Sequence, residues 1–439
     1  MLAACLIAGC GSGDGAAAED VPASTTEAAC TVDAQRSWLR DYMNDRYFWY
    51  ADLGVPDESA PDIDAYFKSL LYRPIDRYSF SQPTSDFLQL FSEGTRTGYG
   101  YSVVFADASQ TALRIRFAEP LSPVGLAGLK RGDTVLSIDG YGPAQIVAGT
   151  PGNVRTEGIP RNFRVVDSSG VERSFTVNSA TYRITTVPDS GVLKFSAPSG
   201  PVKAGYLLYQ SFIATSTGAL GTAFSEFAAQ GINELIVDLR YNGGGRVTMA
   251  RNLASMIGGS GLDGKTFAEF RFNAKHPENN LSVAFTSRAA LLPAAPLTGL
   301  NRVIVITSPS TASASELVIN ALKPFTNVVL IGGTTYGKPY AFQPRAFCGT
   351  TYNAVNFEFV NALGEGGFIN GIAPTCTAAD DLDHELGDIN EASLATAVHY
   401  IKTGACPVEA IGRFPQAAGT PPGEEAVFGD EGAKQLILD

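Results

Sequence analysis

The sequence is poor in histidine, with three in 439 residues, and it contains no Cys-x-x-Cys pair. Histidines and closely spaced cysteines are the usual zinc ligands, so no metal site is expected and no cofactor is implied. Positive charge is also scarce: 32 lysines and arginines face 44 acidic residues, a net charge of −12. An acidic surface of this kind is a poor partner for nucleic acid or anionic lipid headgroups. No segment has the apolar run that a membrane span needs.

The N-terminus reads MLAACLIAGCGSGDG, a short apolar stretch that ends at a cysteine and turns abruptly polar. Ile7-Ala-Gly-Cys10 resembles the lipobox of bacterial lipoproteins, in which the cysteine is lipidated; Leu2-Ala-Ala-Cys5 is a weaker match. The basic region that opens a signal peptide is missing, which suggests a true start further upstream. The resemblance implies lipidation at Cys10 and a periplasmic lipoprotein of the cell envelope, whose contact with the membrane is this anchor.

The remaining cysteines are Cys30, Cys348, Cys376 and Cys406. Four cysteines in an exported protein predict two disulfides, and three pairings are open. We favour Cys348–Cys376, which closes one excursion of the chain. The partner bond would be Cys30–Cys406, tying the N-terminal region to the end of the core.

Composition and periodicity divide the chain into five parts, and the length predicts about three folded domains. In the N-terminal domain, apolar residues recur at the spacing of a helix that packs on a core, namely at Leu39, Tyr42, Met43 and Tyr47. The five parts are a signal and polar tether (1–29), a helical domain (30–97), a β-domain (98–181), an α/β core (182–410) and a tail predicted to be disordered (411–439).

The β-domain begins with GYGYSVVF and continues to SPVGLAGLKRGDTVLSIDG, a helix end, a turn and an apolar strand. This pattern resembles a bacterial PDZ domain. The resemblance implies that the loop of Gly98, Tyr99, Gly100 and Tyr101 holds the terminal carboxylate of a peptide through backbone N–H groups. The peptide would then add as a strand to the neighbouring sheet edge.

The core shows repeated β-loop-α units, with buried-strand runs at 233–239, 302–307 and 327–333. Such units predict a largely parallel sheet, whose functional loops lie at the carboxyl ends of the strands. If the three strands are neighbours, their loops converge. These loops are Asn242–Gly245, Ser310–Glu316 and Thr334–Pro339.

Ser313 and Glu316 admit two interpretations. They fit the S-x-x-E capping box, in which each side chain binds a free backbone N–H of the first helical turn. Alternatively, Ser313 is a nucleophile at a helix N-terminus. Short motifs have many false positives, so this motif alone favours the cap.

The three loops together favour the nucleophile. A serine hydroxyl requires a base, and none of the three histidines lies in these loops. A desolvated lysine can serve instead, because burial disfavours its charged form, and Lys338 is the lysine of the third loop. The glycine loop could point N–H groups at a developing oxyanion.

At this point DLRYNGGG, TASASELVINAL and GGTTYGKP resemble the three signatures of carboxy-terminal processing (tail-specific) serine peptidases. The resemblance covers residues 30–406. It implies a multidomain α+β protein with an N-terminal helical region, a PDZ domain and an α/β core similar to ClpP and the crotonases. It also implies Ser313 as nucleophile and Lys338 as general base, 25 residues later (338 − 313). The oxyanion donors would be Ala314 with Gly244 or Gly245, and the substrates proteins or peptides with free C-termini.

The sequence departs from the family at two positions: Pro339 replaces the glycine that follows the lysine, and a supporting glutamine is missing. Many members carry a glutamine four residues after the lysine, where this chain has Phe342, and Gln343 comes one later. The third catalytic residue is therefore either Glu316 or Gln343. Two other functions stay open: a noncatalytic peptide- or ligand-binding protein on the same fold, which the intact Ser-Lys pair disfavours, and a crotonase-like acyl enzyme, which the PDZ module disfavours. The natural substrate and any activating partner cannot be read from the sequence.

Overall fold

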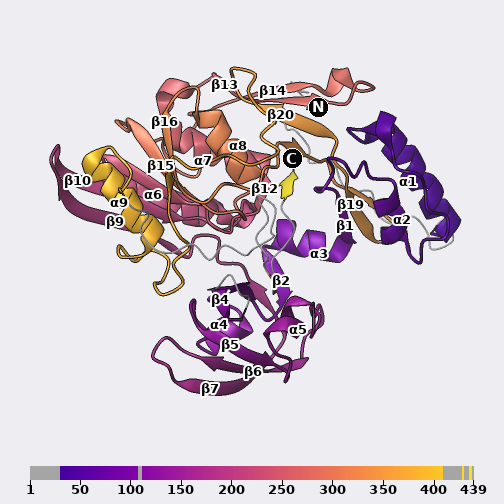
Figure 1. Ribbon diagram of the computed structural model, residues 1–439. Helices are drawn as coiled ribbons and strands as arrows, with labels where there is room; N and C mark the ends of the chain where they lie inside the picture. Colours follow the sequence, from indigo (N-terminus) through magenta and orange to yellow (C-terminus); the bar gives the residue numbers. More distant parts are fainter. Residues whose placement is uncertain (1–29, 107–110, 409–427, 430–434, 438–439) are drawn as a thin grey trace, which may run out of the picture.

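The computed structural model describes residues 30–106, 111–408, 428–429 and 435–437. Figure 1 shows an α/β core with helices at one side and a small β-sheet unit below it. Cys10 lies outside the described residues, as does most of the tail 411–439. Within the described ranges, no helix combines the length and the apolarity needed to cross a membrane.

The N-terminal region packs its helices on an aromatic core. The predicted stripe is confirmed as core, because Leu39, Met43 and Tyr47 are fully buried. One strand was missed there: β1 (Phe80–Pro83) pairs antiparallel with β19 (Thr350–Asn353), far along the chain. The other elements of this region are α1 (Val32–Arg46), α2 (Ile63–Ser69), α3 (Thr84–Leu88) and β18 (Arg345–Phe347), which pairs with β19.

The small unit is an antiparallel sheet with two short helices. The chain enters it through β2 (Thr95–Gly98) and leaves it through β8 (Ala180–Arg183), and these two strands pair with each other. The helix end, turn and strand expected before Gly140 are present as α4 and β5. The elements are β3 (Tyr101–Phe105), β4 (Leu113–Ala118), α4 (Pro123–Leu126), β5 (Thr134–Ile138), α5 (Pro143–Val147), β6 (Pro160–Val166) and β7 (Glu172–Asn178).

The core sheet has the order β21-β16-β15-β11-β10-β9 and is parallel except for the β9–β10 hairpin. The three predicted strands are confirmed as β11, β15 and β16, and they are neighbours. The bounds are β9 (Asp189–Ala197), β10 (Gly200–Leu208), β11 (Glu234–Asp238), β15 (Arg302–Thr307), β16 (Asn327–Gly332) and β21 (Cys376–Thr377).

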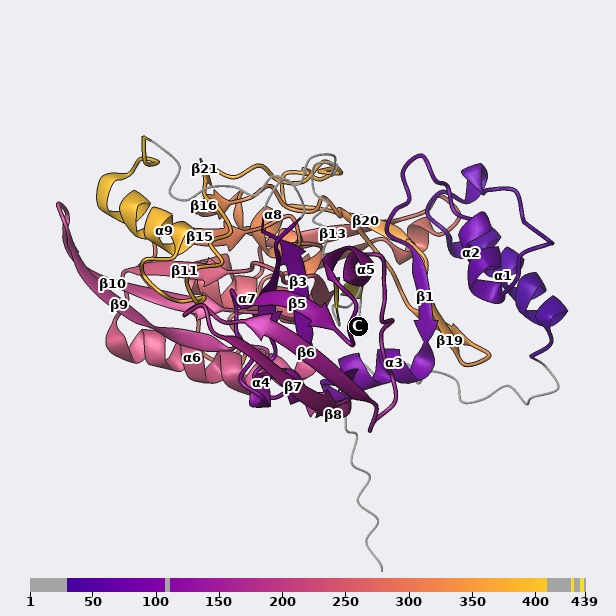
Figure 2. The same ribbon diagram turned by 60° about the horizontal axis from the view of Figure 1, so that its bottom comes forward.

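Helices cover both faces of this sheet (Figure 2). Side chains alternate across a strand, so Leu235 and Val237 pack on one face while Ile236 packs on the other. This explains the unbroken apolar runs in the sequence, since strands buried on both faces need apolar residues at every position. The first face carries α6 (Thr217–Gln230), α7 (Val247–Gly258) and α8 (Ala314–Leu322), and the second carries α9 (Ala392–Thr403).

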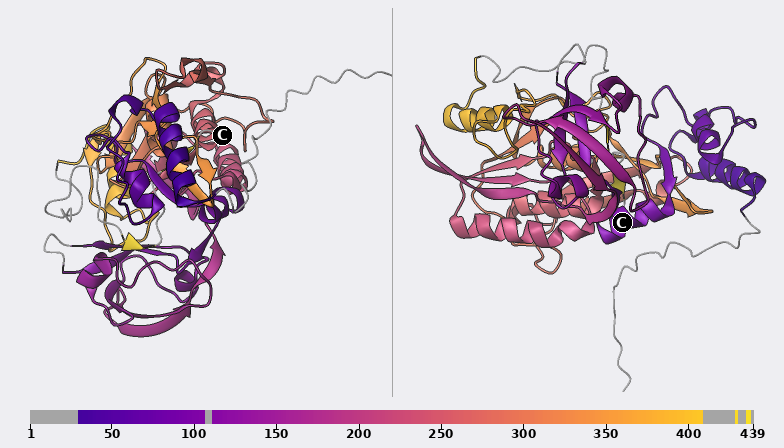
Figure 3. Two further views of the ribbon diagram at one scale, coloured as in Figure 1. Left: turned by 90° about the vertical axis from the view of Figure 1, so that its right-hand side faces the viewer. Right: turned by 90° about the horizontal axis from the view of Figure 1, so that it is seen from below.

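A second sheet, β14-β13-β20-β17, packs on the same core. Figure 3 shows the small unit, coloured magenta, lying against one side of the core. Its strands are β13 (Thr266–Phe272), β14 (Leu281–Ala284), β17 (Tyr340–Ala341) and β20 (Phe357–Val360). Three short strands complete the set of strands in the described residues. They are β12 (Gly244–Arg246), β22 (Phe428–Gly429) and β23 (Gln435–Ile437).

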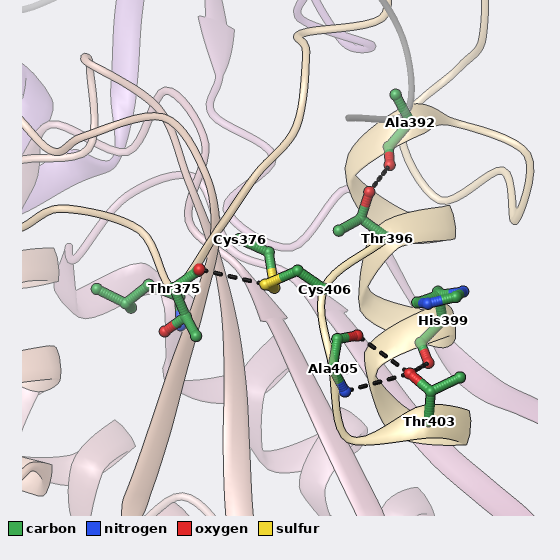
Figure 4. Close-up of a disulfide and its surroundings, with 9 residues drawn as sticks. Thr375, Cys376, Ala392, Thr396, His399, Thr403, Ala405 and Cys406 are labelled. Atoms are coloured by element: carbon green, nitrogen blue, oxygen red, sulfur yellow. Dashed lines mark hydrogen bonds between the residues drawn. A yellow bond between two sulfur atoms is a disulfide. The ribbon is translucent and has the colours of Figure 1, made fainter. Parts of the chain in front are cut away.

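The described residues contain two disulfides, but the favoured pairing was wrong: the bonds are Cys30–Cys348 and Cys376–Cys406. Cys348 lies in the β18–β19 turn, which the pairing of β1 with β19 brings beside the start of α1; the rings of Trp38 and Phe347 stack there. Cys376 lies in the edge strand β21, and Cys406 follows α9, which packs on the same sheet face. Figure 4 shows this bond, with Cys406 Sγ 3.3 Å from the Thr375 carbonyl oxygen.

Candidate active site

The three predicted loops meet at the carboxyl edge of β11, β15 and β16. Hydrogen bonds join each loop to the next: Ala312 N–H donates to the Asn242 carbonyl (3.1 Å), and Tyr336 N–H donates to the Thr311 carbonyl (2.9 Å). The loop of Ser310–Glu316 is therefore fixed between the other two. The convergence expected from strand order is confirmed.

Ser313 is fully buried and immediately precedes α8. Its backbone has φ 63° and ψ −111°, a conformation that L residues rarely adopt. Within the described ranges its Oγ has no hydrogen-bond partner. Only one half of the predicted capping box is therefore formed. Glu316 accepts from Ser313 N–H, but the serine hydroxyl accepts no hydrogen bond from the first turn of the helix.

Glu316 is a buried carboxylate with four donors. It accepts from the backbone N–H groups of Ser313 (2.8 Å), Gly337 (2.7 Å) and Lys338 (2.8 Å), and from the Thr335 hydroxyl (2.6 Å). Burial raises the pKa of Glu316, and the four donors oppose that rise. One side chain thus fixes the backbones of Ser313 and Lys338 relative to each other.

Lys338 is also fully buried, and its Nζ lies 3.8 Å from the centroid of the Phe342 ring. The N-terminal region holds the loop around it. The Tyr78 hydroxyl donates to the Gly337 carbonyl (2.8 Å), and Arg77 Nη2 donates to the Tyr336 carbonyl (2.7 Å). Sequence reasoning missed these two residues, because nothing local to them signals a contact with a loop so far along the chain.

The two candidates for the third residue lie differently. Glu316 bridges the serine and lysine loops, whereas Gln343 follows the aromatic ring that packs on Lys338, and its backbone N–H donates to Asn356 Oδ1 (2.8 Å). Phe342 thus lies next to the lysine, at the position where the family resemblance implied a glutamine. This arrangement favours Glu316.

The glycine loop is held by the side chain of Asn242. Its Oδ1 accepts from Gly244 N–H (2.9 Å) and its Nδ2 donates to the Tyr209 carbonyl (2.8 Å). Gly244 and Gly245 have φ of 107° and 143°, and a Cβ on Gly245 would lie 2.3 Å from the Phe212 carbonyl oxygen. Glycine is therefore required at 245. The clamp by Asn242 was not predicted, although its place before three glycines was a signal.

The other two serines of the motif have structural partners. Ser315 Oγ donates to the Asn242 carbonyl (3.0 Å). Ser310 Oγ accepts from Arg116 Nη1 of the small unit (3.0 Å). Both hydroxyls therefore hold the loop in place.

The loop expected to bind peptides leads from β2 into β3. Tyr99 is buried beneath the Arg161 guanidinium, 4.4 Å from its ring centroid, and Tyr101 opens β3. Gly98 ends β2, and Gly100 has φ 84°. A Cβ on Gly100 would lie 2.0 Å from Ser122 Cβ, so any larger residue there would disturb the small unit itself.

Comparison with known proteins gives two family matches. The profile of Peptidase family S41 matches residues 203–377, and that of the Peptidase S41 N-terminal domain matches residues 34–80. A chloroplastic C-terminal processing peptidase of Tetradesmus obliquus is 26% identical over 348 residues, which are 74% of this chain and 71% of that one. A carboxyl-terminal-processing protease of Synechocystis is 27% identical over 256 residues, 57% of this chain and 55% of its own length.

Among solved structures, an S41 protease from Bacteroides fragilis superposes with a TM-score of 0.66 at 24% sequence identity. The match covers 84% of this chain and 97% of that one. At this identity the likeness concerns the fold.

Proposed function

Because this chain belongs to the carboxyl-terminal processing serine peptidases of family S41, we propose that it is a serine endopeptidase cleaving proteins or peptides near their C-termini. Ser313 is the nucleophile and Lys338 the general base. The observation that carries the assignment is the Glu316 carboxylate, which binds the backbone N–H groups of both residues.

The reaction begins when Ser313 Oγ attacks the scissile carbonyl carbon and its proton passes to the neutral Lys338 amine. The oxyanion is held by the N–H groups of Ala314 and of the glycine loop. Gly245 is the better donor of that loop, since Gly244 N–H already donates to Asn242. Lys338 then protonates the departing amine, the C–N bond breaks and an acyl ester remains. Water, deprotonated by the same lysine, hydrolyses this ester.

The backbone of Ser313 supports this role. A nucleophile on a sharp turn before a helix projects its hydroxyl away from the main chain, and such strain is common at functional sites. Glu316 is a positioning residue, because it acts through the backbones of the two reacting residues.

The sequence of the small unit resembles a PDZ domain, and we assign this unit the binding of substrate C-termini through Gly98–Tyr101. A peptide with a free carboxylate should be cleaved faster than the same peptide amidated. Equal rates would show that the unit does not read the carboxylate.

We also place the protein in the cell envelope as a lipoprotein. The two disulfides support an oxidising compartment. Labelling with a fatty-acid probe should be lost in Cys10→Ser, and labelling that persists would exclude this anchor.

The catalytic assignment is tested with Ser313→Ala and an unstructured polypeptide substrate. This variant should show no cleavage, while Ser315→Ala, which loses only its bond to the Asn242 carbonyl, should keep cleaving. Full activity in Ser313→Ala would overturn the assignment. Substrate binding without cleavage in the wild type would favour the noncatalytic alternative.

A further inference from the structure

Two short strands near the end of the described chain, β22 and β23, each pair with a sheet edge that an extended substrate could use. The first, β22, pairs antiparallel with β3, matching Phe428 with Val103 and Gly429 with Ser102. Without β22, β3 would be the edge of the small sheet. An edge strand offers unpaired backbone groups that accept an added strand from any polypeptide. β3 begins at Tyr101, within the loop assigned to peptide binding.

The second strand, β23, lies at the catalytic loops. It pairs in parallel with β12, matching Gly244 with Gln435, Gly245 with Leu436 and Arg246 with Ile437. It also lies beside β17, which starts two residues after Lys338. Figure 1 shows the yellow strand next to β12. β23 therefore runs between the proposed oxyanion loop and the strand that follows the proposed base.

Both pairings use backbone atoms, so they do not depend on the sequence of the added strand. A protease that accepts extended polypeptides needs such surfaces, first to hold a chain and then to lay it beside the nucleophile.

We propose that the β3 edge and the β12 edge are two halves of one track for an extended polypeptide, and that β22 and β23 of the chain itself occupy these two edges in the resting enzyme. The proposal rests on the proposed function for the nature of the external substrate. These two strands compete with that substrate, which must displace them before Ser313 can attack. The enzyme thus restrains itself in cis.

The competition is tested in the full-length chain with Phe428→Pro and Leu436→Pro. Proline removes one backbone N–H and does not fit a paired strand, so each change should weaken one pairing. Ala418→Pro, outside both strands, is the matched control. We expect kcat/KM to rise about tenfold in Leu436→Pro and not in Ala418→Pro, because a short tether holds its ligand at an effective concentration of about 1 mM.

A synthetic peptide of residues 424–439 provides the reverse test. It should inhibit the Leu436→Pro enzyme competitively, whereas the same peptide carrying Phe428→Pro and Leu436→Pro should not, because proline does not fit a paired strand. An unchanged kcat/KM in both proline variants, together with no inhibition by the peptide, would overturn the proposal.

Amide hydrogen exchange separates this proposal from the catalytic one, since it needs no turnover. In a Ser313→Ala background, Leu436→Pro should speed exchange at Gly245, since the N–H groups of Gly244 and Arg246 donate to Asn242 and Phe212. Phe428→Pro should speed exchange at residues 102–103. If exchange responds but the wild type cleaves nothing, the occupied track stands and the peptidase assignment fails. If the wild type cleaves but neither proline changes exchange, the occupied track fails and the peptidase assignment stands.

Discussion

Glu316 binds the backbones of the two residues proposed to react, Ser313 and Lys338, so its replacement should affect geometry before chemistry. In Glu316→Gln one oxygen becomes an NH₂ group, which would face backbone N–H donors. Buried donors left unpaired cost about 1–3 kcal/mol of the free energy of unfolding. We expect that loss in urea unfolding, and a fall in kcat larger than the rise in KM. Glu226→Gln, at an exposed position of α6, is the control; a normal kcat in Glu316→Gln would remove its positioning role.

Replacing Lys338 with arginine tests whether its positive charge or its ability to accept a proton is needed for cleavage. Lys338→Arg keeps a long cationic side chain over the Phe342 ring, but arginine stays protonated and cannot accept the serine proton. The variant should be inactive in a peptide-cleavage assay. Lys323→Arg, at the exposed end of α8, should retain full activity. Cleavage by Lys338→Arg at the wild-type rate would mean that another group is the base.

At the level of elements, each disulfide links two segments that sheet pairing or packing on a sheet places side by side. Cys376–Cys406 ties the edge strand β21 to the end of α9, across a sequence separation of 30 residues. In the chain-entropy treatment, opening a loop of this size lowers the free energy of unfolding by about 3–4 kcal/mol. The double variant Cys376→Ser/Cys406→Ser should show this loss in urea unfolding. Non-reducing peptide mapping of the wild type provides the control, and finding Cys348 joined to Cys376 would contradict the pairing.

For the whole molecule, a buried polar cluster fixes the small unit against the core. Arg131 of the small unit donates to the Tyr241 hydroxyl (2.7 Å) and pairs with Asp380, which lies after β21. Arg116 stacks on the Tyr241 ring, 4.2 Å from its centroid, and reaches Ser310. The serine loop is thus in direct contact with the unit proposed to bind peptides.

Asp380→Asn tests this contact. Burial tends to raise the pKa of Asp380, but Arg131 and Arg240 outweigh it and the pKa is lowered from 3.8. A carboxylate whose folded-state pKa is lowered stabilises the protein above its unfolded pKa, and this contribution is lost as the pH falls through the folded pKa. We expect Asp380→Asn to lose about 3 kcal/mol at neutral pH, because the arginine is left buried without its partner. The difference from wild type should shrink below pH 3.8.

The control for this prediction is Asp383→Asn. Asp383 pairs with Arg114 but is 77% exposed, so its loss should cost less than about 1 kcal/mol. An Asp380→Asn protein as stable as wild type at neutral pH would show that the cluster does not hold the two units together.

The sequence by itself determined the three core strands and the loops that follow them. These features are local in the sequence. A strand that is buried on both faces must be apolar at every position, and the candidate catalytic residues follow directly after each such strand. The buried stripe of the first helix and the strand-turn pattern of the small unit were predicted for the same reason.

Tertiary structure alone decided which distant segments meet. The Cys30–Cys348 bond depends on the contact of β1 with β19. No sequence pattern near residue 80 indicates that this segment pairs with a strand near residue 350. The grip of Arg77 and Tyr78 on the lysine loop, and the choice of Glu316 over Gln343 as the bridge, likewise rest on distances between residues far apart in the chain. The local sequence pattern of a segment predicts which of its residues are buried. It does not predict which other segment covers them, because that depends on tertiary packing.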